Sequence, residues 1–373
     1  MIAKDPALDR RIWMLAWPLL LSNITAPLLG LVDTAVVGHL DSPVYLAAVA
    51  LGSNVFMFLY FSFNFLRMGT TGFTSQARGA GEATLVVLLR ALLLSTLVGS
   101  ALILLRPLLS DAALWLLGGS DEVQGLAREY IGIRILGAPA ALGNFALIGF
   151  AIGLHRTSVP LKMTVLMHSS NVLLDVLLVQ VWHFDVRGVA VASAVSEYLG
   201  LAGGLFWLRR EIFGAAWRAL PVGALKQVAP MLQLLAVNRD IFIRSLALLT
   251  VFFFFTAQGA RLGDTVLAAN AVLITFLLLL SNTLDGFANA AEALVGDATG
   301  RRDRRALDAA VAGTGKWTLI IAAAALLAFV AGGGPLIRLL TDLPGVRDTA
   351  TTYLPWMLLL PLTASAGFWL DGV

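Results

Sequence analysis

The chain has 373 residues, of which 58% are hydrophobic and only 13% are charged, and its mean hydropathy is +0.84. Ordinary soluble domains carry about 25% charged residues, so this composition excludes a soluble globule and indicates a polytopic helical membrane protein. The absence of cysteine excludes disulfides and thiol chemistry, and a net charge of only +3 does not indicate a nucleic-acid partner.

Ten apolar stretches are long enough to cross a bilayer as helices. They cover residues 13–38, 46–68, 84–106, 129–153, 160–181, 188–208, 232–258, 266–295, 313–333 and 350–373. Because no small-residue cleavage site follows the first stretch, we interpret it as a retained helix and not as a signal peptide. The predicted fold class is an all-α polytopic membrane protein with ten transmembrane helices.

The loops between these stretches differ in charge on the two sides of the membrane. With the N-terminus in the cytoplasm and alternating helices, 15 lysines and arginines fall on the cytoplasmic side and six on the outer side. Cytoplasmic loops of membrane proteins carry such an excess. The distribution therefore supports both the helix count and a cytoplasmic N-terminus.

The second half of the chain repeats the first. The segment that begins at Leu46 aligns without a gap with the one from Leu267, and the segment from Tyr130 resembles the one from Tyr353. Repeats with an even number of helices are parallel, and an axis along the membrane normal relates the two bundles. Since the last stretch runs to the final residue, we expect a truncated second bundle. The predicted parts are a six-helix bundle (1–208), a cytoplasmic linker (209–231) and an incomplete bundle of four helices (232–373).

Two carboxylates lie inside the apolar stretches, Asp33 in the first and Asp175 in the fifth. Asn171 lies one helical turn before Asp175 on the same face, and Ser193 falls at a similar membrane depth in the sixth stretch. Acids within a membrane are costly and usually face a cavity or a partner. We interpret the four as an oxygen cage for Na⁺ or for a proton shared by two acids. The alternative is that the acids only hold helices together by hydrogen bonds.

Three further residues accompany this candidate cage. Pro27 and Gly30 precede Asp33 and predict a bend in the first helix that depends on protonation of Asp33, although a static kink fits them equally well. Glu197 lies one turn from Ser193 and is a candidate for a proton path, with simple packing as the equal alternative.

The remaining membrane charges favour structural roles. Asp240 and Arg244 have the spacing of an ion pair on one helix, and Arg67 and Arg90 are expected to anchor helices at the membrane surface. The four histidines lack metal-ligand spacing, and no nucleotide-binding or hydrolase motif is present. We predict no enzyme and no cofactor apart from the coupling ion.

Several runs along the chain have the pattern of a known family. They include SNITAPLLGLVDTAVVGHLDSPVYL (22–46), FLRMGTTGFTSQARGAG (65–81), NVLLDVLLV (171–179) and LDGFANAAEALVG (284–296). These runs resemble the MATE family of multidrug and toxic compound extrusion transporters, in particular its DinF-like branch. The resemblance extends over essentially the whole chain.

This resemblance implies two six-helix bundles, the second reduced to four helices here, and export of amphipathic or cationic compounds in exchange for H⁺ or Na⁺. It places the ion site of the first bundle on Asp33, Asn171, Asp175 and Ser193, where serine replaces a frequent threonine. The implied protein is a multi-pass monomer of the bacterial inner membrane, with small amphipathic molecules and the lipid bilayer as partners. A lipid-linked precursor flippase of the same fold and an inactive truncated fragment are the alternatives.

Overall fold

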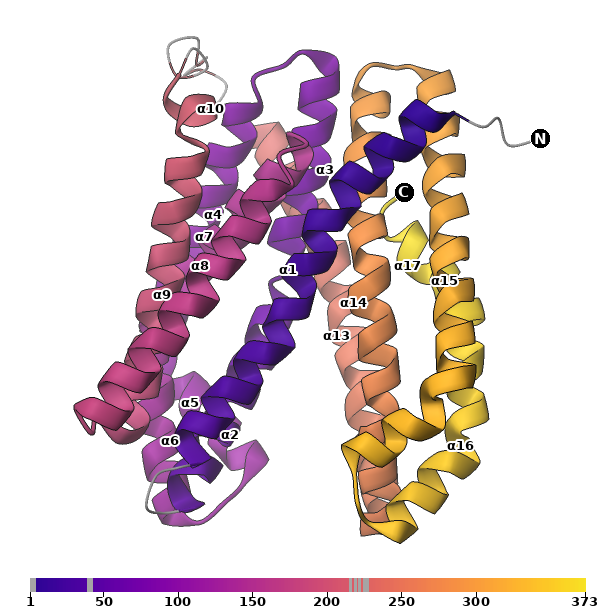
Figure 1. The fold of residues 1–373 in the computed structure, drawn as a ribbon. Coiled ribbons are helices and arrows are strands. Elements are labelled where there is room, and N and C mark those ends of the chain that lie inside the picture. The colour runs from indigo at the N-terminus through magenta and orange to yellow at the C-terminus, as the bar shows by residue number, and fades with distance from the viewer. Residues whose placement is uncertain (1–4, 39–42, 215–216, 218–219, 221–222, 224–227) are drawn as a thin grey trace.

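The computed structural model is helical throughout the part of the chain that it describes (Figure 1). It describes all residues except 1–4, 39–42, 215–216, 218–219, 221–222 and 224–227. The side chains of residues 24–38, 43, 228–235, 237–238, 260 and 264 also lie outside the description.

The helices of the first half of the chain are α1 (Pro6–Gly38), α2 (Pro43–Ser62), α3 (Phe65–Ala80), α4 (Thr84–Leu104), α5 (Arg106–Leu117), α6 (Asp121–Arg134), α7 (Ala138–Gly153), α8 (Ser158–Asp175) and α9 (Asp185–Trp207). A 3₁₀ turn, η1 (Ile135–Gly137), joins α6 to α7, and a π-helical segment, η2 (Val176–Val181), continues α8. The second half holds α10 (Arg209–Phe213), α13 (Val228–Arg261), α14 (Asp264–Gly300), α15 (Arg304–Leu340), α16 (Pro344–Thr363) and α17 (Ser365–Leu370).

The predicted apolar stretches all lie in helices. Nine helical stretches among the described residues are long and apolar enough to cross a membrane, and α1 contains the first predicted stretch. Helix α5 was not predicted, because its 12 residues are too short for a span. Trp115 of α5 is 84% exposed, and α5 lies at the end of the molecule opposite the N-terminus (Figure 1).

The spanning helices form two bundles that lie side by side (Figure 1). In the first bundle α7 is central and packs against α3, α4 and α9, while α8 packs against α9. Leu142, Leu147 and Phe150 of α7 are completely buried. In the second bundle α14 packs against α15, α16 and α17. The two bundles meet where α3 lies along α14.

Helix α1 connects the bundles by crossing from one to the other (Figure 1). Near its start, the Asp9 carboxylate accepts hydrogen bonds of 2.6 Å from Lys316 and 2.8 Å from Trp317, both on α15. Further along, the Ser22 and Thr164 hydroxyls are 2.8 Å apart, which joins α1 to α8. One helix therefore contacts both repeats.

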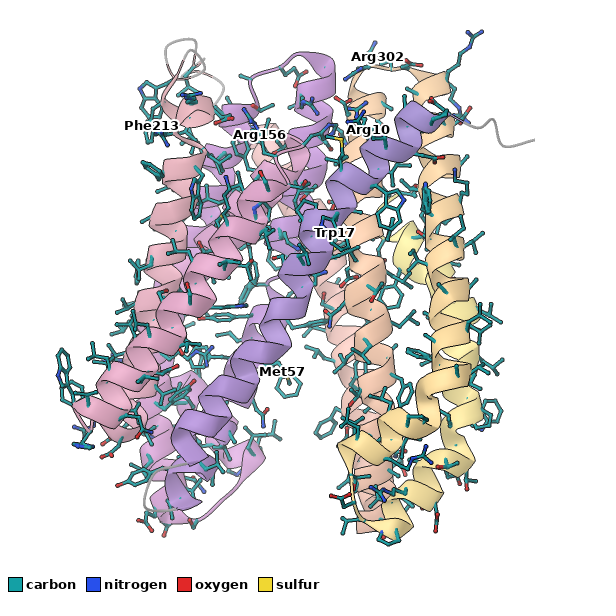
Figure 2. The ribbon with its side chains drawn as sticks, viewed as in Figure 1. Arg10, Trp17, Met57, Arg156, Phe213 and Arg302 are labelled. Carbon is teal, nitrogen blue, oxygen red and sulfur yellow. The ribbon has the colours of Figure 1, made fainter. Side chains whose placement is uncertain are left out.

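Arg10, Arg156 and Arg302 lie at the same end of the molecule, the end that carries the N-terminus (Figure 2). We call this the basic end. The turns from α3 to α4, from α7 to α8 and from α14 to α15 lie there too (Figure 1). The predicted linker, 209–231, begins here as α10, and part of it lies outside the described residues.

Candidate ion-coupling site

Asp175, Asn171 and Ser193 are buried between α8 and α9. Asp175 is 0% exposed and Asn171 only 2%. The amide Nδ2 of Asn171 lies 3.5 Å from the Ser193 hydroxyl, so the two helices bring these residues together. Asp175 is the last residue of α8, and the backbone becomes π-helical directly after it. Such π-helical turns are rare and are frequently found at functional sites.

The other predicted members of the cage belong to α1. Asp33, Pro27 and Gly30 lie in helical backbone, but their side chains are outside the described residues. Helix α1 packs along α8, as a shared ion between Asp33 and Asp175 would require. The meeting of the two carboxylates and the bend at Pro27 and Gly30 stay predictions.

Glu197 lies in a polar cluster that the sequence analysis did not foresee. Its carboxylate is almost completely buried and accepts a hydrogen bond of 3.3 Å from the Tyr60 hydroxyl of α2. The positive charge of Arg134, at the end of α6, acts on this carboxylate. The Arg134 guanidinium also donates to the Tyr130 hydroxyl and lies 4.8 Å from the centre of the Phe56 ring.

The break in the helix after Arg134 makes room for this cluster. A Cβ atom on Gly137 of η1 would lie 2.3 Å from the Glu197 carboxylate, so a larger residue there would push the carboxylate aside. The Asn144 amide of α7 donates a hydrogen bond of 2.9 Å to the backbone carbonyl of Glu197. Arg134 was overlooked because it is close to the start of a predicted stretch. Its place beside Phe56 and near Glu197 depends on how α2 and α9 pack.

Arg67 and Arg244 lie at the boundary between the bundles. Arg67 of α3 donates a hydrogen bond of 3.0 Å to Asn64 and another to Asn289 of α14. Arg67 thus joins α3 to α14, and the expectation that it anchors a helix at the membrane surface stays a prediction. Arg244 pairs with Asp371.

The expected ion pair between Asp240 and Arg244 is wrong. Asp240 pairs instead with the neighbouring Arg239, at 2.8 Å. Helical spacing permits a pair of residues four apart, but the approach of α17 gives Arg244 a carboxylate from a distant part of the chain.

The backbones of α3 and α14 touch near the basic end. A Cβ atom on Gly79 would lie 2.1 Å from the carbonyl oxygen of Asp297, and one on Gly300 would lie 2.0 Å from that of Gln76. The internal repeat aligns Gly79 with Gly300 and Gln76 with Asp297. The contacts are thus reciprocal, as parallel repeats related by a two-fold axis require. We call this contact the α3–α14 seam.

The family model that matches this chain is MatE, and it matches residues 18–177 and 241–373. The chain belongs to the MatE family. Among its relatives, the DNA damage-inducible protein F of Escherichia coli is 41% identical over 98% of this chain and 80% of that protein. A probable multidrug resistance protein NorM from Synechococcus is 27% identical over 83% of this chain and 68% of that protein.

Solved MATE structures have the same fold. A MATE structure in a bent conformation matches with a TM-score of 0.87 and 21% identity, over 100% of this chain and 85% of that one. A multidrug resistance MATE transporter in an outward-facing conformation matches with a TM-score of 0.86 and 21% identity, over 98% and 82% of the two chains. This MATE protein is therefore a multi-pass membrane transporter and not an enzyme, and its likeness to the Escherichia coli protein confirms the predicted DinF-like branch.

The chemistry of the site in this MATE protein suits a hard cation or a proton. Its described part offers one carboxylate, one amide and one hydroxyl, all oxygen ligands of the kind that Na⁺ and H⁺ prefer. No group of three or more histidine, aspartate or glutamate side chains that could hold a metal ion occurs within the described residues. A complete cage would need Asp33 from α1.

Proposed function

We propose that this transporter exports amphipathic organic cations in exchange for H⁺ or Na⁺, and that Asp33, Asn171, Asp175 and Ser193 bind the coupling ion. The observation that carries the proposal is the burial of the Asp175 carboxylate beside Asn171 and Ser193, next to a helix that holds a second acid. A carboxylate is retained at such a position when it serves an ion or a proton.

In this proposal the protein works as a monomer in the bacterial inner membrane, with its basic end in the cytoplasm. The excess of basic residues at that end supports the orientation. The α3–α14 seam closes the space between the repeats there, and transport requires the seam to part and re-form as the bundles rock against each other. Binding of the ion shifts the balance between the closed and the parted seam only if the ion binds one of these two states more tightly than the other.

Glu197 extends the proposed ion path by one helical turn from Ser193. Its hydrogen bond from Tyr60 joins α9 to α2. A proton that leaves the Asp175 site would thus meet a second acceptor inside the same bundle.

The test is efflux of a fluorescent cationic dye from everted vesicles that carry the chain, with a proton or a sodium gradient imposed alone. Asp33→Asn and Asp175→Asn should each lower the rate at least tenfold, because an amide cannot take up a proton and binds cations weakly. Asp308→Asn, on an exposed carboxylate of α15, is the matched control and should transport normally. Normal efflux by both site variants would remove the proposal.

Export of a lipid-linked precursor is the second candidate, since two arginines lie at the boundary between the bundles. A pyrophosphate group would need such positive charge. However, Asp371 pairs with Arg244, and the charges of both arginines act on Asp285 and Glu292, which leaves little positive potential. Translocation of a fluorescent polyprenyl diphosphate in liposomes, without dye transport, would favour this function instead.

A further inference from the structure

Helix α8 carries a narrow stripe of polar side chains inside a segment that is apolar enough to span the membrane. Its members, spaced one or two helical turns apart, are Thr157, Thr164, His168, Asn171 and Asp175. At 3.6 residues per turn these five positions fall within an arc of about 60°. The most exposed apolar residues of α8, Val165 and Leu173, lie outside this arc. One face of α8 is therefore polar from the basic end to the predicted ion cage.

Two hydrogen bonds join this face to α1, which lies along α8 (Figure 1). The Thr157 hydroxyl donates to the Met14 carbonyl oxygen at 3.4 Å, and the Ser22 and Thr164 hydroxyls are 2.8 Å apart. The two pairs are separated by 143 and 142 positions in the chain, so α1 and α8 run parallel in one register.

The same register extends to the ion cage. Asp33 and Asp175 are also 142 positions apart, and α1 still contacts η2, the segment that follows Asp175. The register therefore brings the backbones of these two residues to the same height along the helices, as a shared ion requires.

His168 lies on the polar face between the Ser22–Thr164 contact and Asn171. It is seven residues before Asp175 and thus about 10 Å nearer the basic end. Its Nδ1 atom is buried, and no hydrogen-bond partner for this atom occurs among the described residues. Depending on the tautomer of the neutral ring, Nδ1 is an acceptor without a donor or a donor without an acceptor. Such buried atoms are rare in proteins, and each needs an explanation.

No charged side chain in the described part of the chain acts on the imidazole of His168. The sequences of α7 and η2, which both pack on α8, contain no titratable residue. On α9 the acid nearest the middle of the helix is Glu197, which accepts a hydrogen bond from Tyr60 of α2. The other titratable residues of α9 lie at its outer end or bind elsewhere, namely Asp185, Arg187 and Tyr198. On α1 the only charged residue beyond the first two turns is Asp33. The acids nearest to His168 along the polar face are therefore those of the ion cage.

We propose that His168 is a second proton-binding residue of the coupling site, which receives the proton from Asp175 and passes it toward the basic end, so that the coupling ion of this chain is H⁺. The proposal rests on the proposed function in that Asp175 binds the ion, and it deepens that function by choosing H⁺ over Na⁺. Unlike the oxygen ligands of the cage, a ring nitrogen binds a proton but is not a ligand that hard cations prefer.

The transfer moves one proton and no electrons. The proton leaves the Asp175 carboxyl group and binds Nδ1 of a ring that carries its other proton on Nε2, which forms an imidazolium. Neighbours on a helix face are about 5–6 Å apart, and a water molecule between them bridges this distance. The imidazolium then releases a proton on the side of the basic end. An ordinary imidazole titrates near pH 6.5 and can therefore give up its proton to a neutral cytoplasm.

The test uses the same vesicles, with a proton or a sodium gradient imposed alone. His168→Asn keeps a polar group at the place of Nδ1 but cannot titrate, so proton-driven transport should fall at least tenfold. Exchange of radiolabelled tetraphenylphosphonium for the unlabelled cation moves no net proton, so this variant should keep at least half of the normal exchange rate. A residue that only holds the helices together would lose both activities to the same extent.

His183→Asn is the matched control. His183 is exposed after η2, at the end opposite the basic end, and its backbone has a φ of 53°, which asparagine adopts readily. This variant should show normal proton-driven transport and normal exchange.

The proposal is overturned if His168→Asn keeps the normal rate of proton-driven transport, or if it loses exchange to the same degree. It is also overturned if a sodium gradient drives the unaltered chain and a proton gradient does not. In each of these cases the ion cage stands as long as Asp33→Asn and Asp175→Asn lose transport. Normal transport by those two variants would instead remove the proposed function, so the two failures are separate results.

Discussion

Equivalent segments of the two repeats have very different surroundings. Tyr130 in the first repeat is 0% exposed, whereas its counterpart Tyr353 on α16 is 49% exposed. Tyr130 lies under α2 and packs beside the Phe56 ring. In contrast, Trp356, one turn from Tyr353, is 65% exposed. Similar sequences thus form similar helices, but neighbouring helices decide whether a side chain is core or surface.

This difference predicts that the same kind of substitution has unequal effects in the two repeats. The first bundle holds close backbone contacts and buried polar clusters around α7, so a single substitution there should lower the stability of the protein. Single substitutions on the exposed faces of the second bundle should be tolerated. Three matched pairs of variants follow, from the largest expected effect to the smallest.

Gly149→Leu should prevent correct folding. A Cβ at Gly149 of α7 would lie 2.4 Å from the carbonyl oxygen of Arg67 on α3, and backbone cannot move aside as a side chain can. Gly332→Leu on α15 is the control, because no atom lies within 4 Å of an added Cβ there. The measurement is the yield of monodisperse protein in detergent. Equal yields for the two variants would mean that α3 and α7 are not in backbone contact.

Arg134→Met should destabilise the protein by about 2–3 kcal/mol, because it removes the guanidinium that donates to the buried Tyr130 hydroxyl and the positive charge that acts on the buried Glu197 carboxylate. Arg244→Met, in the second repeat, should cost less, since Arg244 and Asp371 are each about 40% exposed. Thermal unfolding in the same detergent compares the two variants. The double variant Arg134→Met with Glu197→Gln should recover most of the loss, and no recovery would show that the pair does not interact.

Tyr130→Phe should cost about 1–2 kcal/mol, since the buried hydroxyl accepts from Arg134 and lies 3.1 Å from the Ser53 hydroxyl. Tyr353→Phe is the repeat-equivalent control on an exposed ring and should leave the melting temperature unchanged within error. A larger loss for Tyr353→Phe would reverse the comparison and place the tighter core in the second repeat.

The sequence by itself determined the helices, the repeat and the family. Apolar length marks a span wherever it occurs, so the ten predicted stretches lie in helices, and the repeat is visible in the aligned residues themselves. Asn171, Asp175 and Ser193 were predicted as ion ligands together with Asp33, because acids and amides in apolar helices stand out, and the complete cage stays a prediction. Each of these is a local signal.

Only the tertiary structure decided which distant residues meet. The contacts of His155 with Arg11 and Ala293, and of Arg244 with Asp371, join segments that lie far apart in the chain. No local spacing encodes them, because they depend on how bundles pack after each helix has formed. For the same reason the sequence did not predict that Arg67 bonds to Asn289, where α3 packs on α14.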